Sequence, residues 1–116
     1  MHYQVSPFEE VKLVRCTRGA VYDVIIDLRP ESPTFKEWLG MELSAANRRS
    51  IYIPTGFAHG FQTLEENTEL FYQMSVPCTP ESAKGVMWND QTIGIEWPNG
   101  VQTISTKDTL YPDFTL

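Results

Sequence analysis

The chain has 116 residues and a net charge of −6, with 41% hydrophobic and 21% charged residues. This is the composition of a globular domain, so we expect residues 1–116 to form one domain whose core needs neither disulfides nor a structural metal. The acidic balance excludes nucleic acid as an expected partner, because phosphate contacts require a basic surface.

Cysteine usage and apolar runs indicate the compartment. Cys16 and Cys78 form no CxxC motif and no Cys/His cluster, which favours a reducing compartment over a disulfide or zinc scaffold. We find no signal-peptide core near the N-terminus and no apolar run of about 18 residues. We therefore expect a cytoplasmic protein that does not contact membranes.

The first predicted elements are two strands rich in β-branched residues, over 11–16 and 20–28, and the turn signal between them predicts a hairpin. Residues 34–39 are the one candidate helical fragment, and Gly40 ends it. Further predicted strands cover residues 41–44, 50–53 and 69–75, and residues 101–104 alternate weakly before an irregular tail. Strands that recur at roughly ten-residue spacing favour a sandwich or a barrel, so the predicted fold class is all-β.

The segment from Pro54 to His59 contains the most informative turn. Its Pro-x-Gly-x-x-His pattern is typical of a tight turn that returns the histidine toward a barrel interior, with Gly56 supplying the backbone freedom. Taken alone, His59 is more readily explained as a hydrogen-bonded structural histidine than as a functional one. Since His2 and His59 are the only histidines, a metal ion would need several carboxylate ligands, and we expect no metal site.

Nine short strings, in order and with compatible spacing, resemble the dTDP-4-dehydrorhamnose 3,5-epimerase family. They are HYQ at 2–4, KLVR at 12–15, RGAVYDV at 18–24, DLR at 27–29, SPTF at 32–35, PTGFAHGF at 54–61, ELFYQ at 69–73, GIEWP at 94–98 and STKD at 105–108. The resemblance covers nearly the whole chain. It implies a cupin-type jelly-roll barrel, free of metal and cofactor and usually a homodimer. Such a barrel would invert carbons 3 and 5 of a 4-keto-6-deoxyhexose attached to dTDP.

Chemistry at such a sugar needs three kinds of group. A ketone at carbon 4 acidifies the protons on carbons 3 and 5, so the reaction needs a base, a cation that stabilises the enolate, and an acid on the opposite face. By the resemblance, His2 is the base and Asp108 orients its imidazole. Tyr72 is the proton donor, and Lys12 lies near the enolate oxygen.

The resemblance also implies residues that support binding. His59 and Lys107 match residues that contact the substrate, and Asp23 helps to hold the region of His59 or Lys12. Without the resemblance, a structural histidine, a solvated loop carboxylate and a packed tyrosine remain the simpler interpretations of such residues.

Period-2 alternation places two of the catalytic candidates independently of the resemblance. Tyr72 shares a strand face with Leu70, and we expect that face to line the barrel interior. Lys12 shares a face with Val14 and Cys16, and an inward lysine is costly unless it is paired. A lysine at the strand edge whose ammonium reaches water is the alternative.

The chain also departs from the family pattern. The family carries a segment before the His-Tyr-Gln string that contributes to substrate binding, whereas this sequence begins one residue before His2, so we expect an N-terminally shortened barrel. The family tends to carry an aromatic residue at Cys78 and a Glu at Ala83. Three hypotheses therefore stand: a 3,5-epimerase, an inactive or binding-only cupin paralogue or fragment, and a related 3-epimerase or ketoisomerase for a dTDP-4-keto sugar.

Overall fold

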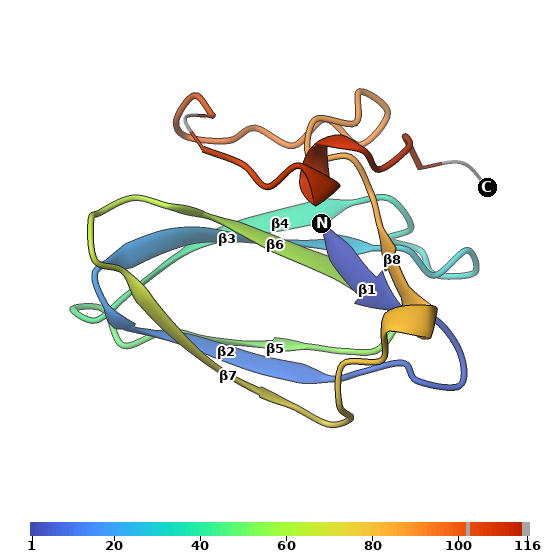
Figure 1. Ribbon diagram of the computed structural model, residues 1–116, viewed down its shortest axis with the longest axis horizontal. Helices are drawn as coiled ribbons and strands as arrows, with labels where there is room; N and C mark the ends of the chain where they lie inside the picture. The colour runs from blue at the N-terminus through green and yellow to red at the C-terminus, as the bar shows by residue number, and fades with distance from the viewer. Residues whose placement is uncertain (102, 115–116) are drawn as a thin grey trace.

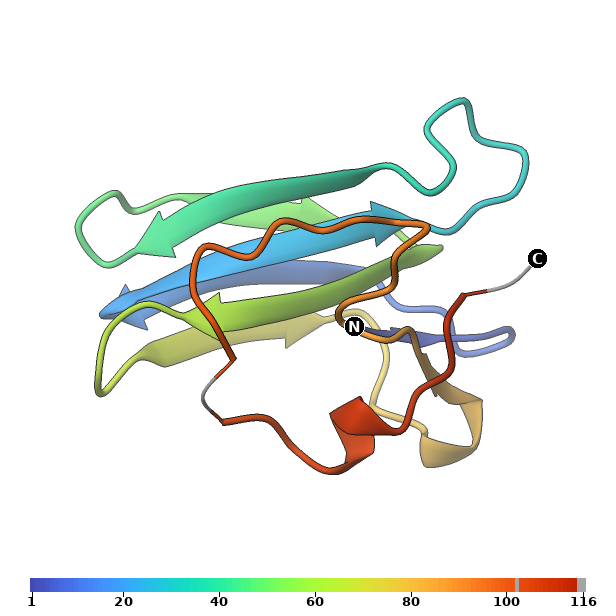
Figure 2. The same ribbon diagram turned by 90° about the horizontal axis from the view of Figure 1, so that it is seen from above.

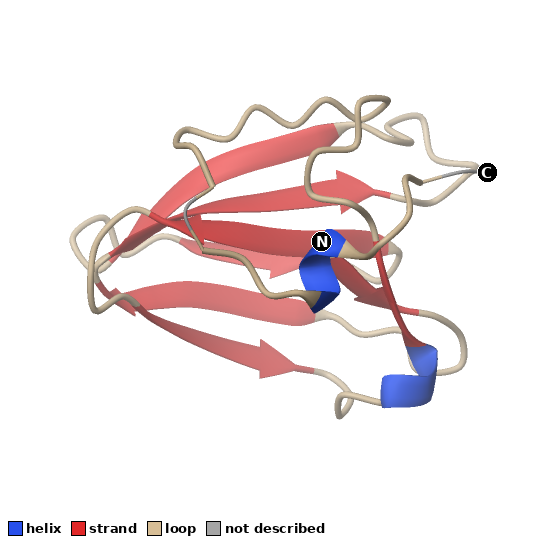
Figure 3. Ribbon diagram, turned by 45° about the horizontal axis from the view of Figure 1, so that its top comes forward, coloured by secondary structure: helices blue, strands red, loops and turns tan. Residues whose placement is uncertain are grey.

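The computed structural model describes residues 1–101 and 103–114 and consists of two antiparallel β-sheets that face each other (Figure 1). The five-stranded sheet has the order β4-β3-β6-β1-β8, and the three-stranded sheet has the order β5-β2-β7. The strands are β1 (His2–Gln4), β2 (Lys12–Arg18), β3 (Ala20–Asp27), β4 (Trp38–Ser44), β5 (Ser50–Ile53), β6 (Phe57–Thr63), β7 (Glu69–Met74) and β8 (Ala83–Gly85). In this part of the chain the helical elements are two 3-10 turns, η1 (Pro80–Ser82) and η2 (Lys107–Thr109) (Figure 3). The predicted all-β class is confirmed.

Strand β3 is buried on both of its faces. Val21 and Ile25 pack into a core between the two sheets, while Val24 and Ile26 pack into a second core on the outer side of the five-stranded sheet. The segment that follows β8 covers this outer side (Figures 1 and 2). A strand buried on both faces has apolar residues at neighbouring positions rather than at alternate ones, and β3 has this pattern except at the buried Asp23 and Asp27.

Hydrogen bonds within the C-terminal segment fix its path, and aromatic packing holds it against the sheet. The buried Asp90 accepts the backbone N–H of Phe114 at 2.6 Å. Trp97 donates its indole N–H to the carbonyl oxygen of Trp88 at 2.9 Å, and its ring packs edge-on against Tyr22 with the ring centroids 6.4 Å apart. These contacts hold the segment in place without strand structure, and η2 lies beside the start of β1 (Figure 1).

The predicted hairpin between β2 and β3 is wrong. β2 pairs with β5 and β7, whereas β3 pairs with β4 and β6, so the chain crosses from one sheet to the other at Gly19. Both strands direct apolar side chains into the core between the sheets, for example Val14 from β2 and Val21 from β3. Strand propensity and turn signals depend only on neighbouring residues, so the sequence of a hairpin turn and that of a turn between two sheets carry the same signals. The pairing partner depends on which faces are buried together.

The predicted helical fragment over residues 34–39 is also wrong. Turns continue to Lys36, whose φ of 68° lies in the left-handed region that a helix interior excludes, and β4 begins at Trp38. The N–H of Lys36 donates to the carbonyl oxygen of Asp27 at 2.7 Å, and the N–H of Asp27 donates to that of Glu37 at 3.0 Å. The segment therefore extends the pairing between β3 and β4 instead of forming a helix.

The remaining predicted strands have mixed outcomes. The strands predicted over 50–53 and 69–75 are present as β5 and β7, and residues 41–44 are the second half of β4. Residues 101, 103 and 104 form no strand, and Gln102 lies outside the described residues. Within the described residues, no helix is long and apolar enough to cross a membrane. That residues 1–116 form one domain stays a prediction.

Candidate functional site

A pocket of about 500 Å³ is lined by residues of β1, β2, β6, β7 and β8 and of the C-terminal segment. The predicted site residues that line it are His2, Lys12, His59, Tyr72, Lys107 and Asp108. Asp23 does not line the pocket, and it contacts His59 instead. The β-sheet register places His2 directly opposite His59 across β1 and β6. The fold therefore brings residues from both ends of the chain and from its middle to one pocket.

His2 and Asp108 form the first pair of this site. Nε2 of His2 is hydrogen-bonded to Oδ1 of Asp108, and the two side chains are 49% and 26% exposed. The hydroxyl of Ser105 donates to the other carboxylate oxygen at 2.6 Å and accepts the backbone N–H of Asp108 at 3.2 Å. Both oxygens of Asp108 are thus hydrogen-bonded, and the Ser-x-x-Asp spacing suits the turn that leads into η2.

The pocket changes the protonation of this pair. Burial lowers the pKa of His2 below its ordinary value of 6.5, and the hydrogen bond to Asp108, which raises it, does not compensate. Burial raises the pKa of Asp108, but the hydrogen bonds with Ser105 and His2 together lower it below its ordinary value of 3.8. At neutral pH, His2 is therefore neutral and Asp108 ionised. When Nε2 carries the proton toward the carboxylate, Nδ1 has a free lone pair and can act as a base.

Tyr111 packs against His2 from the C-terminal segment. The two rings meet edge to face with their centroids 5.7 Å apart. His2 is also the register partner of Gly85 on β8, and a Cβ atom on Gly85 would lie 2.3 Å from the ring of Tyr111. A glycine is needed here because any side chain would push the tyrosine ring off the strand and away from His2.

The turn from Pro54 delivers His59 to the pocket wall, as its sequence pattern predicts. Gly56 has a φ of +85°, a left-handed conformation that favours glycine, and β6 begins at the next residue. Nε2 of His59 lies 2.6 Å from Oδ1 of Asp23, and the side chains are only 8% and 0% exposed. Asp23 therefore orients His59. The alternative contact of Asp23, with Lys12, is not made, because Lys12 pairs with Glu10.

Lys12 and Tyr72 reach the pocket from the three-stranded sheet. Lys12 faces inward beside the buried Val14, and its Nζ lies 3.0 Å from Oε1 of Glu10. Tyr72 lines the pocket as alternation predicts, yet 53% of it is exposed because β7 is the edge strand of its sheet. A hydroxyl and an ammonium group thus face the same pocket as the two histidines.

Comparison with known proteins identifies the family. The sequence profile of the dTDP-4-dehydrorhamnose 3,5-epimerase family matches residues 1–115. The chain belongs to this family. An epimerase of that name from Salmonella typhimurium is 47% identical over 113 residues, which are 97% of this chain and 62% of the relative. One from Pseudomonas aeruginosa is 45% identical over 109 residues, which are 93% of this chain and 60% of the relative. The chain therefore spans about three-fifths of the length of these curated relatives.

Solved structures of epimerases share this fold. The crystal structure of the Bacillus anthracis epimerase, with TDP and PPi bound, matches with a TM-score of 0.95 and 43% identity over 97% of this chain and 65% of that chain. The Legionella pneumophila epimerase, in complex with dTDP-4-keto-L-rhamnose, matches with a TM-score of 0.89 and 37% identity over 99% of this chain and 67% of that chain. The predicted cupin-type jelly-roll barrel and the predicted epimerase family are both confirmed.

Among the residues of this epimerase-family pocket that sequence reasoning missed, Glu10 and Tyr111 contact the predicted catalytic residues. Glu10 precedes Lys12 by two residues, and residues at this spacing share one side of an extended segment. The cost of an inward lysine is therefore the signal that could have pointed to Glu10. Tyr111 carries no such signal, because it meets His2 only through the path of the C-terminal segment.

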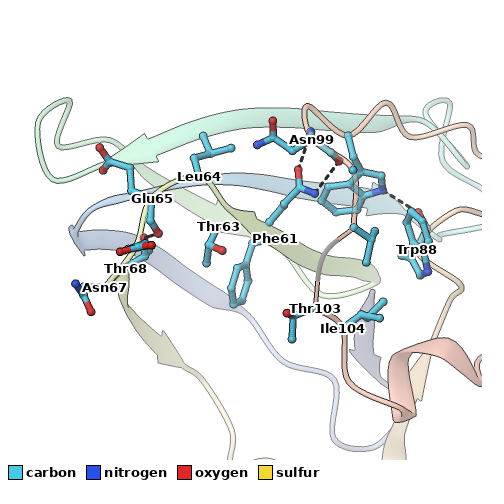
Figure 4. Close-up of a pocket in the computed structure, with 15 residues that line it drawn as sticks. Phe61, Thr63, Leu64, Glu65, Asn67, Thr68, Trp88, Asn99, Thr103 and Ile104 are labelled. Carbon is cyan, nitrogen blue, oxygen red and sulfur yellow. Dashed lines mark hydrogen bonds between the residues drawn. The ribbon is translucent and has the colours of Figure 1, made fainter.

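A larger groove of about 950 Å³ adjoins the pocket and extends toward the turn between β6 and β7 (Figure 4). Phe61, Trp88, Trp97, Thr103 and Ile104 line both the groove and the pocket. None of the predicted catalytic residues lines the groove. The titratable groups suited to proton transfer therefore gather in the smaller pocket, and the groove is an open extension of it.

Proposed function

We propose that this chain forms the catalytic barrel of a dTDP-4-dehydrorhamnose 3,5-epimerase, which converts dTDP-4-dehydro-6-deoxy-D-glucose to dTDP-4-dehydro-L-rhamnose. The main support is that the His2–Asp108 pair, Lys12 and Tyr72 converge on one pocket in a member of this family. Their chemistry matches a reaction that needs a base, a cation and an acid around one sugar ring.

In the proposed reaction His2 removes the proton from carbon 3 or carbon 5. The electron pair of the C–H bond forms a carbon–carbon double bond, and the carbonyl electrons move to the oxygen on carbon 4. Asp108 stabilises the imidazolium that results and holds the ring in the tautomer whose Nδ1 accepts the proton. The low pKa of His2 keeps this nitrogen unprotonated at neutral pH.

Lys12 and Tyr72 complete the proposed proton transfer. The ammonium of Lys12, whose side chain is 13% exposed, stabilises the negative charge that develops on the enolate oxygen. The hydroxyl of Tyr72 then delivers a proton to the same carbon from the opposite face, which inverts the centre. One proton leaves the carbon and one returns, so the inversion is redox-neutral, and His2 and Tyr72 regain their starting protonation by exchanging protons with solvent. The proposed reaction includes no metal and no cofactor.

The proposed substrate-binding residues are His59, held by Asp23, and Lys107. Lys84 also lines the pocket, and both lysines are exposed. Their local positive charge suits the diphosphate of a dTDP-sugar, even though the chain has a net charge of −6. A cytoplasmic location is proposed with this substrate, because nucleotide sugars are made from cytoplasmic nucleotides.

A homodimer is also part of the proposal. On the outer side of the three-stranded sheet, Leu13, Tyr52 and Phe71 are 42%, 62% and 47% exposed, and the register places Leu13 opposite Tyr52. Burying such a patch against a second copy would remove apolar surface from water. Sedimentation should give the mass of a dimer, and Tyr52→Ser should shift the equilibrium toward the monomer. A monomer at every concentration would contradict a dimer.

The deciding experiment is solvent exchange at the sugar. The chain is incubated with dTDP-4-dehydro-6-deoxy-D-glucose in heavy water, and NMR follows deuterium incorporation at carbons 3 and 5. Exchange at both positions supports the 3,5-epimerase. The absence of exchange, with the substrate still bound, identifies a binding-only barrel and contradicts the proposal.

A 3-epimerase is the second candidate, and one comparison favours keeping it. A 3'-monoepimerase from Streptomyces bikiniensis, in complex with dTDP-quinovose, matches with a TM-score of 0.90 and 31% identity. The same fold therefore carries a single inversion in that protein. Deuterium at carbon 3 alone would identify this activity.

A further inference from the structure

Glu10 is a buried carboxylate at the pocket that the proposed reaction leaves without a role. Its side chain is 7% exposed, and Oε1 lies 3.0 Å from Nζ of Lys12, whose side chain is 13% exposed. Oε2 of Glu10 is one of two buried side-chain oxygens in the described residues that have no hydrogen-bond partner. The other is Oδ2 of Asp23, so both unpartnered oxygens belong to acids that pair with a lysine or a histidine of the pocket.

The two charges depend on each other. A buried carboxylate is costly unless a counter-charge compensates it, and Lys12 is the partner that the described residues supply to Glu10. A lysine has a flexible four-carbon stem that can carry its ammonium out to water. The ion pair instead holds the ammonium at the pocket, and two of its three N–H groups stay free for an incoming oxygen.

The backbone around Val11 sets the geometry of this pair. The N–H of Val11 donates to the hydroxyl of Ser75 at 2.8 Å, and the N–H of Ser75 donates to the carbonyl oxygen of Val11 at 3.0 Å. These bonds tie the residue between Glu10 and Lys12 to the end of β7. The two side chains therefore leave an anchored backbone, and the position of the ammonium is determined by the pair.

We infer that Glu10 is a positioning residue, which holds the ammonium of Lys12 at the pocket where it can meet a developing negative charge. That Glu10 holds the ammonium in place is argued from the ion pair with Lys12 alone. Its consequence for turnover rests on the proposed function, because Lys12 acts there on the enolate oxygen. Glu10 acts through Lys12 and does not itself exchange a proton with the sugar.

The first test needs no substrate. Urea unfolding is measured for the parent chain, Lys12→Met, Glu10→Gln and the double variant. Lys12→Met should lower the unfolding midpoint, because it leaves the carboxylate of Glu10 buried without a counter-charge. Adding Glu10→Gln should restore most of that loss, because the neutral amide needs no counter-charge. The exposed Glu9 is the control, and Glu9→Gln should restore nothing.

The result of this cycle is decisive even if Lys12→Met does not fold. In that case the double variant should fold while Lys12→Met with Glu9→Gln should not. Additive midpoints, or a double variant as unstable as Lys12→Met, would overturn the inference, since the two residues would then not be coupled.

The second test separates positioning from mere stability. In the exchange assay, Glu10→Met should lower kcat on the order of 10- to 100-fold with KM changed little, because a misplaced ammonium weakens only the transition state. Glu10→Gln keeps an acceptor oxygen for Lys12 and should lose less. Equal losses for both variants, or a change in KM alone, would overturn the role in turnover. If the parent itself shows no exchange, the proposed function fails while the unfolding cycle still decides the pairing.

Discussion

Replacing Asp108 by asparagine tests the proposed base most directly, because asparagine keeps the shape of the side chain and removes its charge. One oxygen of Asp108 accepts the hydroxyl of Ser105, and the other faces Nε2 of His2. In Asp108→Asn, the amide oxygen can keep the bond from Ser105, which turns the NH₂ group toward His2. Nε2 must then accept a hydrogen bond, so the proton moves to Nδ1, the nitrogen that should act as the base.

The size of the effect follows from the exposure of the pair. A positioned base contributes about 10²–10⁴ in rate, and water weakens the interaction between a base and its charged partner. The side chain of His2 is 49% exposed and that of Asp108 is 26% exposed, so water can stabilise part of the imidazolium charge. We therefore expect the lower end, a loss of about 10² in kcat, which corresponds to about 2.7 kcal/mol of transition-state stabilisation.

Asp108→Asn should also shift the pH dependence of kcat/KM in a direction that a general loss of stability would not produce. In the parent chain, kcat/KM should rise with pH and level off above the pKa of His2, because only the neutral imidazole accepts a proton. Burial lowers this pKa, so the midpoint should lie below pH 6.5. Asp108 raises the pKa of His2 through its hydrogen bond and its charge. Its replacement should therefore move the midpoint to still lower pH while the plateau falls.

The assay is initial-rate deuterium exchange between pH 5 and 9, with urea unfolding as the check on folding. Asp113→Asn is the matched control, because Asp113 is an exposed carboxylate in the same C-terminal segment and should leave the profile unchanged. A rate for Asp108→Asn within a few-fold of the parent, or a midpoint that moves to higher pH, would refute the pairing of base and carboxylate.

Four further measurements test other parts of the molecule. Tyr72→Phe should lower exchange by about 10² or more, whereas Tyr52→Phe, on the outer side of the sheet, should not, and similar rates for both would remove the proposed acid. Gly85→Ala should reduce kcat by displacing the aromatic ring that packs on the base, and unchanged kinetics would contradict that contact. Asp27→Asn should destabilise the chain by about 1–3 kcal/mol at pH 7 in urea unfolding. The hydrogen bond from Arg29 holds the pKa of Asp27 well below its usual range. The stability that ionised Asp27 contributes is therefore fully present above pH 3.8 and is lost as the pH falls toward the folded-state pKa. The difference in stability between Asp27→Asn and the parent should shrink in acid. Treatment with a chelator should leave exchange unchanged, and a loss restored by added metal would show that the reaction needs an ion.

Local patterns in the sequence predicted β2, β3, β5, β7 and the second half of β4, together with several side-chain directions, but they did not predict β1, β6 or β8. Alternation placed Lys12 and Tyr72 on inward faces, and the Pro-x-Gly pattern before His59 encoded its own turn, because backbone preference depends on neighbouring residues. The nine short matches to the family also identified His2 and Asp108 as candidates, although no local sequence pattern predicts that these two residues pair.

Tertiary structure alone decided which strands pair and which charges meet. The crossing at Gly19 has the same local signals as a hairpin, and the segment over 34–39 became part of the β3–β4 connection because its backbone groups bond to Asp27. The partners Glu10 and Tyr111 depend on sheet register and on the path of the C-terminal segment. Contacts between residues far apart in the chain are selected by burial of whole faces, which no short stretch of sequence encodes by itself.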